Sequence, residues 1–310
     1  KHRAASGATG VVRFLMQAAW MIAASLFFAG MGVCIKFASD SFDPLEVVFY
    51  RGVISVVFIG ALARSRGVSL RTHVPMMHVW RNVVGVASLV CWFYAIGQLP
   101  LSTAITLNYM SGIWIAAFII GGTLAMGQLA DVRRQGPLIL TVMAGFAGVV
   151  LLLRPTLEQN QLFAGLIGLL GSLMAALAYM QVAALGRVGE PETRTVFYFS
   201  LAALLAGGLG MLALGAHTLA TGQALWLLPM GLLAALGQLC MTRAYTHGST
   251  IVVANLQYSG IVFGALFGLT LFGDHIPPLG WLGMALIIAC GMAATVLRTR
   301  ALPNPPAEEF

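Results

Sequence analysis

The sequence predicts an all-α integral membrane protein with ten transmembrane helices, arranged as two inverted five-helix repeats around a central cavity. The first observation is composition: 59% of the residues are apolar and only 9% are charged, whereas soluble domains contain roughly 25% charged residues. The second is length, because a span takes roughly 20 residues and a chain of 310 residues accommodates about ten spans with short loops. The apolar runs are also longer than the roughly ten-residue alternating strands of a membrane β-barrel.

Ten apolar windows, each bounded by turn-forming or charged residues, define the predicted helices. Several prolines mark the boundaries between windows, where a fixed φ and a missing N–H are tolerated: Pro44, Pro100, Pro155, Pro191 and the pair Pro277-Pro278. The first window is too long for a signal-peptide core and is interpreted as a retained helix. A cytoplasmic segment, 1–12, is expected before it, and a disordered cytoplasmic tail, 299–310, after the last helix. The predicted helices cover residues 13–38, 44–63, 78–98, 102–125, 133–153, 162–184, 194–215, 225–246, 250–272 and 277–297.

The positive charges predict the orientation of the chain. With the N-terminus inside, all of the 17 Lys and Arg residues except Lys36, Arg51 and Arg154 lie on or near cytoplasmic helix ends. Because cytoplasmic loops are enriched in these residues, both termini are predicted to be cytoplasmic. The net charge of +7 is spread over helix ends and forms no single patch, so nucleic acid is not an expected partner. The expected partners are the lipid bilayer and a small-molecule substrate, and the chain is expected to be a monomer or weak homodimer.

The cysteines and histidines indicate neither a metal site nor catalysis. The four cysteines lie inside apolar segments, without metal-ligand spacing or a disulfide framework, and are interpreted as reduced packing residues. The six histidines fall in terminal or loop regions, and the sequence contains no HExxH or GxSxG string. Nothing resembles the carbonyl filter or charged ring of a channel. We therefore expect no enzyme, no cofactor and no metal.

The two halves of the chain repeat. Ser111-Gly112-Ile113 in the fourth predicted helix recurs 148 residues later as Ser259-Gly260-Ile261, and a Val-Phe-Tyr string in the second helix recurs in the seventh at the same offset. This spacing predicts one five-helix repeat over 13–154 and another over 162–298. Because five is odd, the second repeat enters the membrane upside down relative to the first. Inverted repeats are typical of transporters that alternate access to a site near the bilayer midplane.

Three stretches carry a resemblance to a known family: "VVFYRGV" around Arg51, the segment Arg81–Phe118, and "NLQYSGIVFGALFGLTLFGD" from Asn255 to Asp274. The chain resembles the EamA family of the drug/metabolite transporter superfamily over roughly residues 13–298. The resemblance implies a ten-helix carrier of the inner membrane, often an exporter of amino acids or other metabolites. It also implies a cavity lined mainly by helices 1, 3, 4, 6, 8 and 9. Many relatives have proline where this chain has Gly112, which also permits bending.

Arg51 is the first candidate for substrate binding. It lies about seven residues into the second predicted helix, roughly 10 Å from its end. A charge at that depth usually faces a cavity or a partner. Arg51 either anchors a carboxylate or phosphate of the substrate, or is a structural residue paired with Glu46, Asp43 or helix-end carbonyls.

The fourth and ninth predicted helices supply the next candidates, because both lack charge but carry polar residues near their centres. These residues either bind substrate near the midplane or form hydrogen bonds between helices. Gly112 and Gly260 are the expected flex points, and the GxxxG spacing of Gly260 and Gly264 predicts close helix packing. The candidate binding residues are Asn108, Ser111, Asn255, Gln257, Tyr258 and Ser259.

Neighbouring helices add Trp92, Tyr179 and Gln238 as candidates, with core packing as the alternative for each. Trp92 belongs to a stripe on the third helix that also contains Arg81, Gly85 and Ser88. No Asp or Glu occupies the centre of a predicted helix, so the buried carboxylate of many proton-driven pumps is absent. We expect facilitated diffusion or exchange of a zwitterionic or anionic metabolite by alternating access. A nucleoside or S-adenosyl-type carrier and a non-transporting receptor or scaffold are the alternatives.

Overall fold

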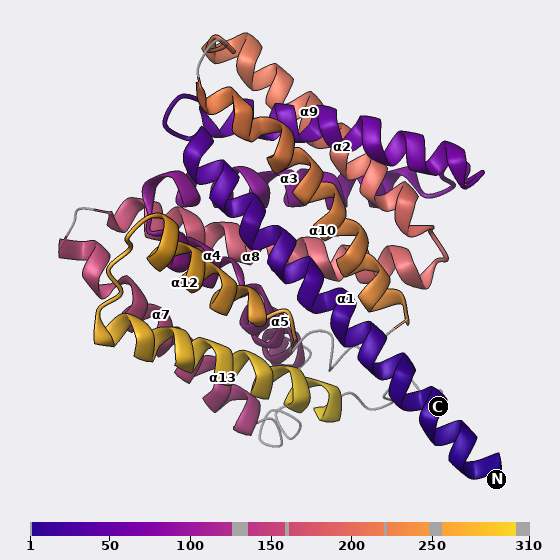
Figure 1. Cartoon of the computed structure of the whole chain (residues 1–310). Coiled ribbons are helices and arrows are strands. Elements are labelled where there is room, and N and C mark those ends of the chain that lie inside the picture. Colours follow the sequence, from indigo (N-terminus) through magenta and orange to yellow (C-terminus); the bar gives the residue numbers. More distant parts are fainter. Residues whose placement is uncertain (1, 126–135, 159–160, 220–221, 248–255, 302–310) are drawn as a thin grey trace.

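The computed structural model describes residues 2–125, 136–158, 161–219, 222–247 and 256–301 (Figure 1). Every regular element in these ranges is helical, which confirms the predicted all-α class. The helices are α1 (His2–Ala38), α2 (Pro44–Ser65), α3 (Pro75–Gln98), α4 (Leu101–Asn108), α5 (Ser111–Ala125), α7 (Gly136–Glu158), α8 (Leu162–Arg187), α9 (Glu192–Leu214), the short 3₁₀ helix η1 (Gly222–Trp226), α10 (Leu227–His247), α12 (Ser259–Leu271) and α13 (Pro278–Ala301).

Most of these helices are suited to a bilayer. Within the described ranges, seven are long and apolar enough to cross a membrane, and three shorter apolar helices accompany them over 136–152, 259–271 and 278–293. Large apolar side chains also cover the outer surface, where Leu212 is 86% and Leu140 is 72% exposed. Such a surface suits hydrocarbon better than water. The chain is a multi-pass membrane protein, and the number of ten spans stays a prediction.

Prolines and glycines set several helix boundaries. α2 begins at Pro44 and α3 at Pro75, positions at which the missing N–H of proline would be unpaired in any case. The Asp43 N–H donates to Glu46 Oε2 at 2.8 Å and closes the first turn of α2. At the end of α9, Gly215 adopts a φ of 92°, which glycine reaches without strain, and the chain leaves the helix there.

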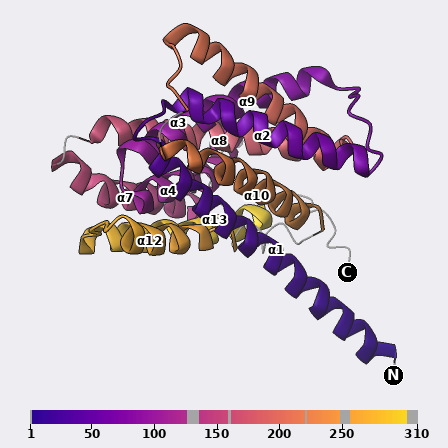
Figure 2. The same cartoon turned by 45° about the horizontal axis from the view of Figure 1, so that its top comes forward.

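The first helix is longer than the sequence predicts. α1 begins at His2 instead of near residue 13, and its N-terminal part projects away from the bundle (Figures 1 and 2). At the other end of the chain α13 continues to Ala301, and the rest of the predicted tail lies outside the described residues. All four cysteines are free, and Cys34, Cys240 and Cys290 are buried, as expected of packing residues.

The fourth predicted helix is interrupted, so the expectation of one continuous helix over 102–125 is wrong. α4 ends at Asn108, Tyr109 and Met110 form a turn, and α5 begins at Ser111. The Met110 N–H donates to the carbonyl of Leu107 at 3.1 Å, a tighter bond than that of a regular α-helix.

A matching interruption precedes α12. Leu256 is helical, Gln257 and Tyr258 form a turn, and α12 begins at Ser259. The two turns lie 148 residues apart, which is the offset of the repeated Ser-Gly-Ile string. The interruption therefore recurs at the same place in both predicted halves.

The tightest helix packing joins the first predicted half to the second. The most extensive contacts are those of α2 with α9, α7 with α13, α3 with α8, and α1 with α10, and Figure 1 shows α2 beside α9 at one side of the bundle and α7 beside α13 at the other. In the two predicted repeats, α1 corresponds to α8, α2 to α9, α3 to α10 and α7 to α13. If each helix is replaced by its counterpart, the pair α1–α10 becomes α8–α3, and the pairs α2–α9 and α7–α13 stay the same, so the set of pairs does not change. A pseudo-twofold relation between the halves would produce this pattern.

Candidate functional site

A cavity lined by both apolar and polar side chains lies among the helices that join the two predicted halves. It contains about 730 Å³ of empty space, part of it open to solvent. Its lining comes from α1, α2, α3, α4, α8, α9 and α10, together with Tyr109 and Gln257 from the two turns. The helices that the family resemblance implies are all represented, and α2 and α9 contribute as well. The helix interruptions thus place side chains of both halves at one cavity.

The structure brings six of the ten candidate binding residues to this cavity. Ser111 and Tyr258 are buried, and Ser259 half-buried, without lining it. Asn255 lies outside the described residues. The six that line the cavity are Arg51, Trp92, Asn108, Tyr179, Gln238 and Gln257.

The three glycine candidates lie where helices approach closely. A Cβ at Gly112 would meet the hydroxyl of Tyr258, and a Cβ at Gly260 would meet the ring of Tyr109. Each interruption therefore supplies a tyrosine that covers the glycine of the other half. Gly264 faces the side chain of Ile105 with no room for a methyl group. This geometry agrees with the packing expected at these positions, whereas bending at Gly112 and Gly260 stays a prediction.

Arg51 is buried in the cavity with only 2% of its surface exposed. Within the described ranges, its Nε and Nη1 have no hydrogen-bond partner. Pairing with Glu46, one of the structural alternatives, is not observed among the described residues. Both carboxylate oxygens of Glu46 instead accept hydrogen bonds from His217. Among the described residues, the Arg51 guanidinium contacts the ring of Phe199, whose centroid lies 5.2 Å from Cζ.

Arg81 also lines the cavity, although it is not among the candidate binding residues predicted from the sequence. The charge count assigns it to a cytoplasmic helix end, but the structure buries it at 6% exposure in the cavity. Its Nε and Nη1 also have no partner in the described part of the chain. Its Cζ lies 3.8 Å from the centroid of Phe199. Gly85, one turn along α3, leaves room for it, because a Cβ there would lie 2.8 Å from Arg81 Nη1. The stripe of Arg81, Gly85, Ser88 and Trp92 was the signal that could have found it.

The cavity is positively charged in the part of the chain that the structure describes. Arg51 and Arg81 line it, and no Asp or Glu does. Trp92 adds a third donor, because its buried Nε1 also has no partner among the described residues. Hydrogen-bond donors without acceptors in a region of low dielectric favour a ligand that supplies negatively charged oxygen atoms.

At the end of the bundle where α1 ends and α2 begins, side-chain contacts join several helices, and we call this the tied end. The ring of Phe37 stacks on Trp226 at 4.6 Å and packs against Phe272 at 4.8 Å. Asp274 Oδ2 accepts a hydrogen bond of 2.9 Å from the N–H of Leu101, and Lys36 Nζ donates to the carbonyl of Leu99. Burial raises the pKa of Asp274, although nearby Lys36 opposes this shift.

Glu46 and His217 form a clasp at the same end. The backbone N–H of His217 donates to Glu46 Oε1 at 2.6 Å, and His217 Nδ1 lies 2.8 Å from Oε2. The clasp joins the first turn of α2 to the loop after α9. Asp43 lies close enough for its carboxylate to form a three-ligand group with these two side chains, but the hydrogen bonds already account for the position of Glu46.

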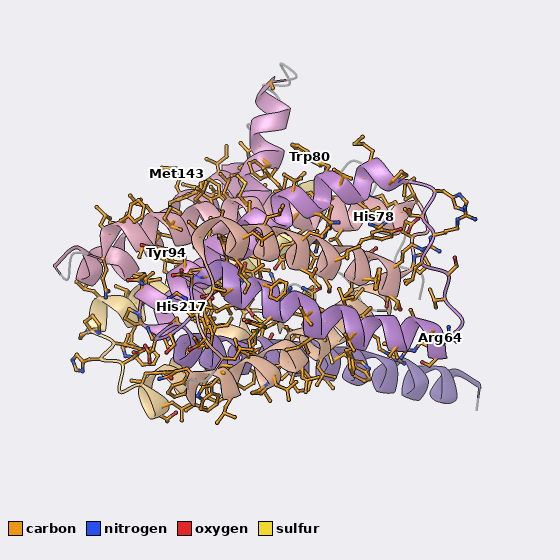
Figure 3. All side chains as sticks on the ribbon, turned by 90° about the horizontal axis from the view of Figure 1, so that it is seen from above. Arg64, His78, Trp80, Tyr94, Met143 and His217 are labelled. Atoms are coloured by element: carbon orange, nitrogen blue, oxygen red, sulfur yellow. The ribbon has the colours of Figure 1, made fainter. Side chains whose placement is uncertain are left out.

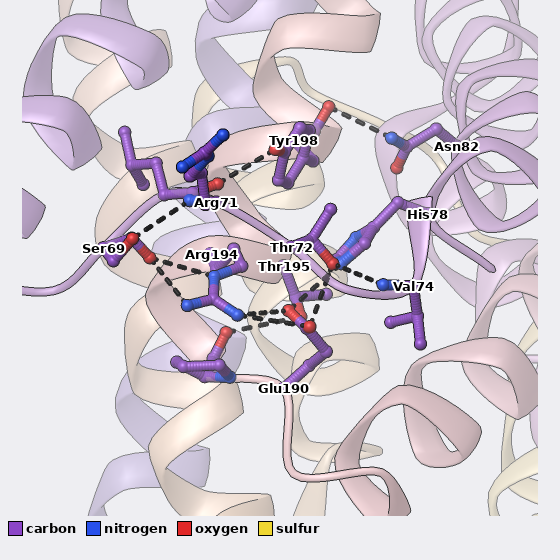
Figure 4. A network of polar contacts seen from close by, with 12 residues as sticks. Ser69, Arg71, Thr72, Val74, His78, Asn82, Glu190, Arg194, Thr195 and Tyr198 are labelled. Carbon is purple, nitrogen blue, oxygen red and sulfur yellow. Dashed lines mark hydrogen bonds and ion pairs between the residues drawn. The ribbon is translucent and has the colours of Figure 1, made fainter. Parts of the chain in front are cut away.

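A second clasp, around Glu190, joins the start of α9 to the loop after α2 (Figure 4). Its carboxylate accepts hydrogen bonds from Thr72 at 2.9 Å and Arg194 at 3.1 Å, and lies 3.3 Å from His78 Nε2. Arg194 also donates to the carbonyl of Ser69. Burial raises the pKa of Glu190, but the hydrogen bonds outweigh it and the net pKa is lowered. His217 and His78 mark opposite ends of the bundle in Figure 3.

Buried polar cavities between the halves of a helical membrane bundle are where secondary transporters hold their substrates. The fold and the cavity thus define the class: a multi-pass membrane transporter. The model of the EamA-like transporter family matches residues 15–154. The chain is 32% identical to the pseudopaline exporter of Pseudomonas aeruginosa over 272 residues, covering 87% of this chain and 92% of that protein. It belongs to the EamA-like transporter family.

More distant relatives extend the comparison. A riboflavin transporter of Rhizobium johnstonii is 28% identical over 283 residues, with 90% of this chain and 91% of the relative covered. A solved crystal structure superposes with a TM-score of 0.63 at 17% identity and covers 94% of this chain and 100% of that chain. The last comparison concerns the fold alone.

Proposed function

We propose that the protein is a secondary transporter that moves small zwitterionic or anionic metabolites across a bacterial-type inner membrane by alternating access. The observation that carries the proposal is the buried guanidinium of Arg51, which lines the cavity and whose Nε and Nη1 have no hydrogen-bond partner among the residues that the structure describes. A carboxylate is the natural acceptor for such donors. The names of the two relatives, a pseudopaline exporter and a riboflavin transporter, support a metabolite as the cargo.

Alternating access would arise from rocking of residues 13–154 against residues 162–298. The pattern of helix pairs supports alternating access through its symmetry, because a pseudo-twofold relation between the halves allows two states in which the halves exchange roles. The interruptions before Ser111 and Ser259 also support it, since broken helices near a substrate site are typical of such transporters. Gly112 and Gly260, next to the interruptions, are the proposed flex points.

The proposed orientation places both termini in the cytoplasm. The tied end around Phe37 then faces outward, while the cavity lining on α1 runs from Met31 towards the cytoplasm as far as Met21. This arrangement corresponds to a state that is closed to the outside. The transporter is proposed to act as a monomer or weak homodimer.

A carrier of neutral aromatic solutes, such as a nucleoside or a flavin, is the second candidate. Trp92, Tyr109, Tyr179 and Phe199 line the cavity and could stack on a planar ring. The riboflavin transporter among the relatives agrees with this alternative. A neutral solute, however, leaves the guanidinium of Arg51 without a counter-charge, which favours the anionic substrate.

Solute counterflow in proteoliposomes tests the proposal. Vesicles loaded with unlabelled alanine, aspartate, succinate, uridine or riboflavin would be diluted into the labelled form of the same solute. We expect transient, saturable accumulation of at least one carboxylate-bearing solute in loaded vesicles and none in protein-free vesicles. Counterflow of uridine or riboflavin alone would favour the second candidate. If the folded protein gives no counterflow with any of the five solutes, this result contradicts the proposed transport of such metabolites and favours a receptor or scaffold.

A further inference from the structure

Two buried arginines from different helices converge on one aromatic ring. Arg51 comes from α2, Arg81 from α3, and both guanidinium groups lie over Phe199 of α9. Because their Cζ atoms lie 5.2 Å and 3.8 Å from the same ring centroid, the two carbons are within about 9 Å of each other. The ring holds both groups in place through its face and leaves their N–H donors available.

The described part of the chain supplies no counter-charge for this pair. The ion pairs found there join His78 and Arg194 to Glu190, and His217 to Glu46. Neither Arg51 nor Arg81 takes part in any of them, and no acidic side chain lines the cavity. Two like charges that are close together and buried are costly unless an opposite charge joins them.

We infer that the cavity selects substrates with two carboxylates, one bound by Arg51 and the other by Arg81, with Phe199 holding the two guanidiniums in position. This inference rests on the proposed transport function and specifies its substrate class. Each arginine offers a planar set of donors that matches one carboxylate, and the unpartnered Nε1 of Trp92 adds a further donor. A single carboxylate would neutralise only one of the two charges.

Binding to the purified protein tests the inference without any variant. The probes are the linear dicarboxylates from malonate to adipate, each paired with the monocarboxylate of equal carbon number, together with aspartate against asparagine and glutamate against glutamine. The readout is the concentration that gives half of the maximal rise in melting temperature. We expect at least one dicarboxylate to act at a concentration at least about tenfold lower than its single-charge counterpart.

Three variants assign the preference to the arginines. Arg51→Gln and Arg81→Gln should each abolish the difference between the paired probes, and Arg81→Lys should retain part of it. Arg64→Gln is the matched control, because Arg64 is an exposed residue of α2 outside the cavity, and it should leave the preference unchanged.

The inference is overturned if no dicarboxylate binds better than its counterpart in the wild-type protein, or if inorganic phosphate replaces the dicarboxylates as the preferred ligand. A preference that persists in a folded Arg81→Gln variant also overturns it. These outcomes are separable from failure of the transport function. If a monocarboxylate shows counterflow and dicarboxylates do not compete with it, the transport function stands and the dicarboxylate inference fails. If dicarboxylates bind but no solute shows counterflow, the dicarboxylate inference stands and the transport function fails.

Discussion

His217 is a single residue whose charge should make stability depend on pH. Its hydrogen bond to the Glu46 carboxylate raises the pKa of His217. The contribution of this pair to stability is therefore complete below the ordinary pKa of histidine, about 6.5, and is lost as the pH rises through the higher value of the folded protein. The melting temperature of the wild type should exceed that of His217→Gln at pH 6, and the difference should shrink by pH 9.

The matched control for this prediction is His275→Gln, because His275 is exposed in the loop after α12. It should not change the pH dependence. Equal differences between wild type and His217→Gln at pH 6 and pH 9 would show that the imidazole does not bind Glu46 as a cation.

Individual residues also show how far the sequence could predict the site. Arg51 and Trp92 were predictable because charge and indole inside an apolar window indicate a cavity or a partner. The role of Phe199 was not, since a phenylalanine in an apolar helix carries no signal of what it contacts. The Glu46–His217 clasp joins residues 171 positions apart, and no local pattern connects them.

The crossing of α2 and α9 depends on small residues. A Cβ at Gly207 would lie 2.5 Å from the backbone nitrogen of Phe49, so Gly207→Ala must push the helices apart. Overpacking of this kind costs roughly 1–3 kcal/mol. We expect Gly207→Ala to lower the free energy of unfolding in detergent by this amount, as measured by denaturant titration.

Gly186→Ala provides the comparison, because a Cβ at Gly186 in α8 has nothing within 4 Å. This variant should be neutral or slightly stabilising, since alanine favours helix over glycine. If Gly207→Ala unfolds at the same denaturant concentration as Gly186→Ala, the close approach of α2 and α9 is wrong.

The Glu190 clasp should stabilise the first turn of α9. Glu190→Gln removes the negative charge that faces Arg194 and His78 and should lower the melting temperature by roughly 2–4 °C. Amide exchange should increase at the start of α9 and in the loop after α2, while the distant start of α2 remains unchanged. Unaltered exchange at residues 192–195 would contradict a stabilising role of the clasp.

Helix positions were largely predictable because proline and charge delimit each apolar window. The interruptions at Tyr109–Met110 and Gln257–Tyr258 were not, since neither stretch contains proline and both read as continuous apolar helix. They depend on tertiary packing, in which Tyr109 and Tyr258 each cover a glycine of the other half.

For the whole molecule, the charge of the cavity predicts the energetics of transport. The described cavity lining contains no carboxylate that could carry a proton across. Counterflow should therefore continue when an uncoupler removes the proton gradient while the substrate gradient is maintained. The measurement is the initial rate of counterflow with and without the uncoupler. Loss of counterflow on uncoupling would contradict facilitated diffusion or exchange.

In the proposed mechanism, the cavity around Arg51 holds the substrate during transport. The most direct test of this role is the concentration dependence of counterflow for the carboxylate solute with the strongest signal, compared between wild type, Arg51→Ala and Arg64→Ala. We expect Arg51→Ala to fold normally but to need at least about tenfold more solute for half-saturation, or to lose counterflow, while Arg64→Ala behaves as wild type. An Arg51→Ala protein that is folded and transports with wild-type half-saturation would contradict this role.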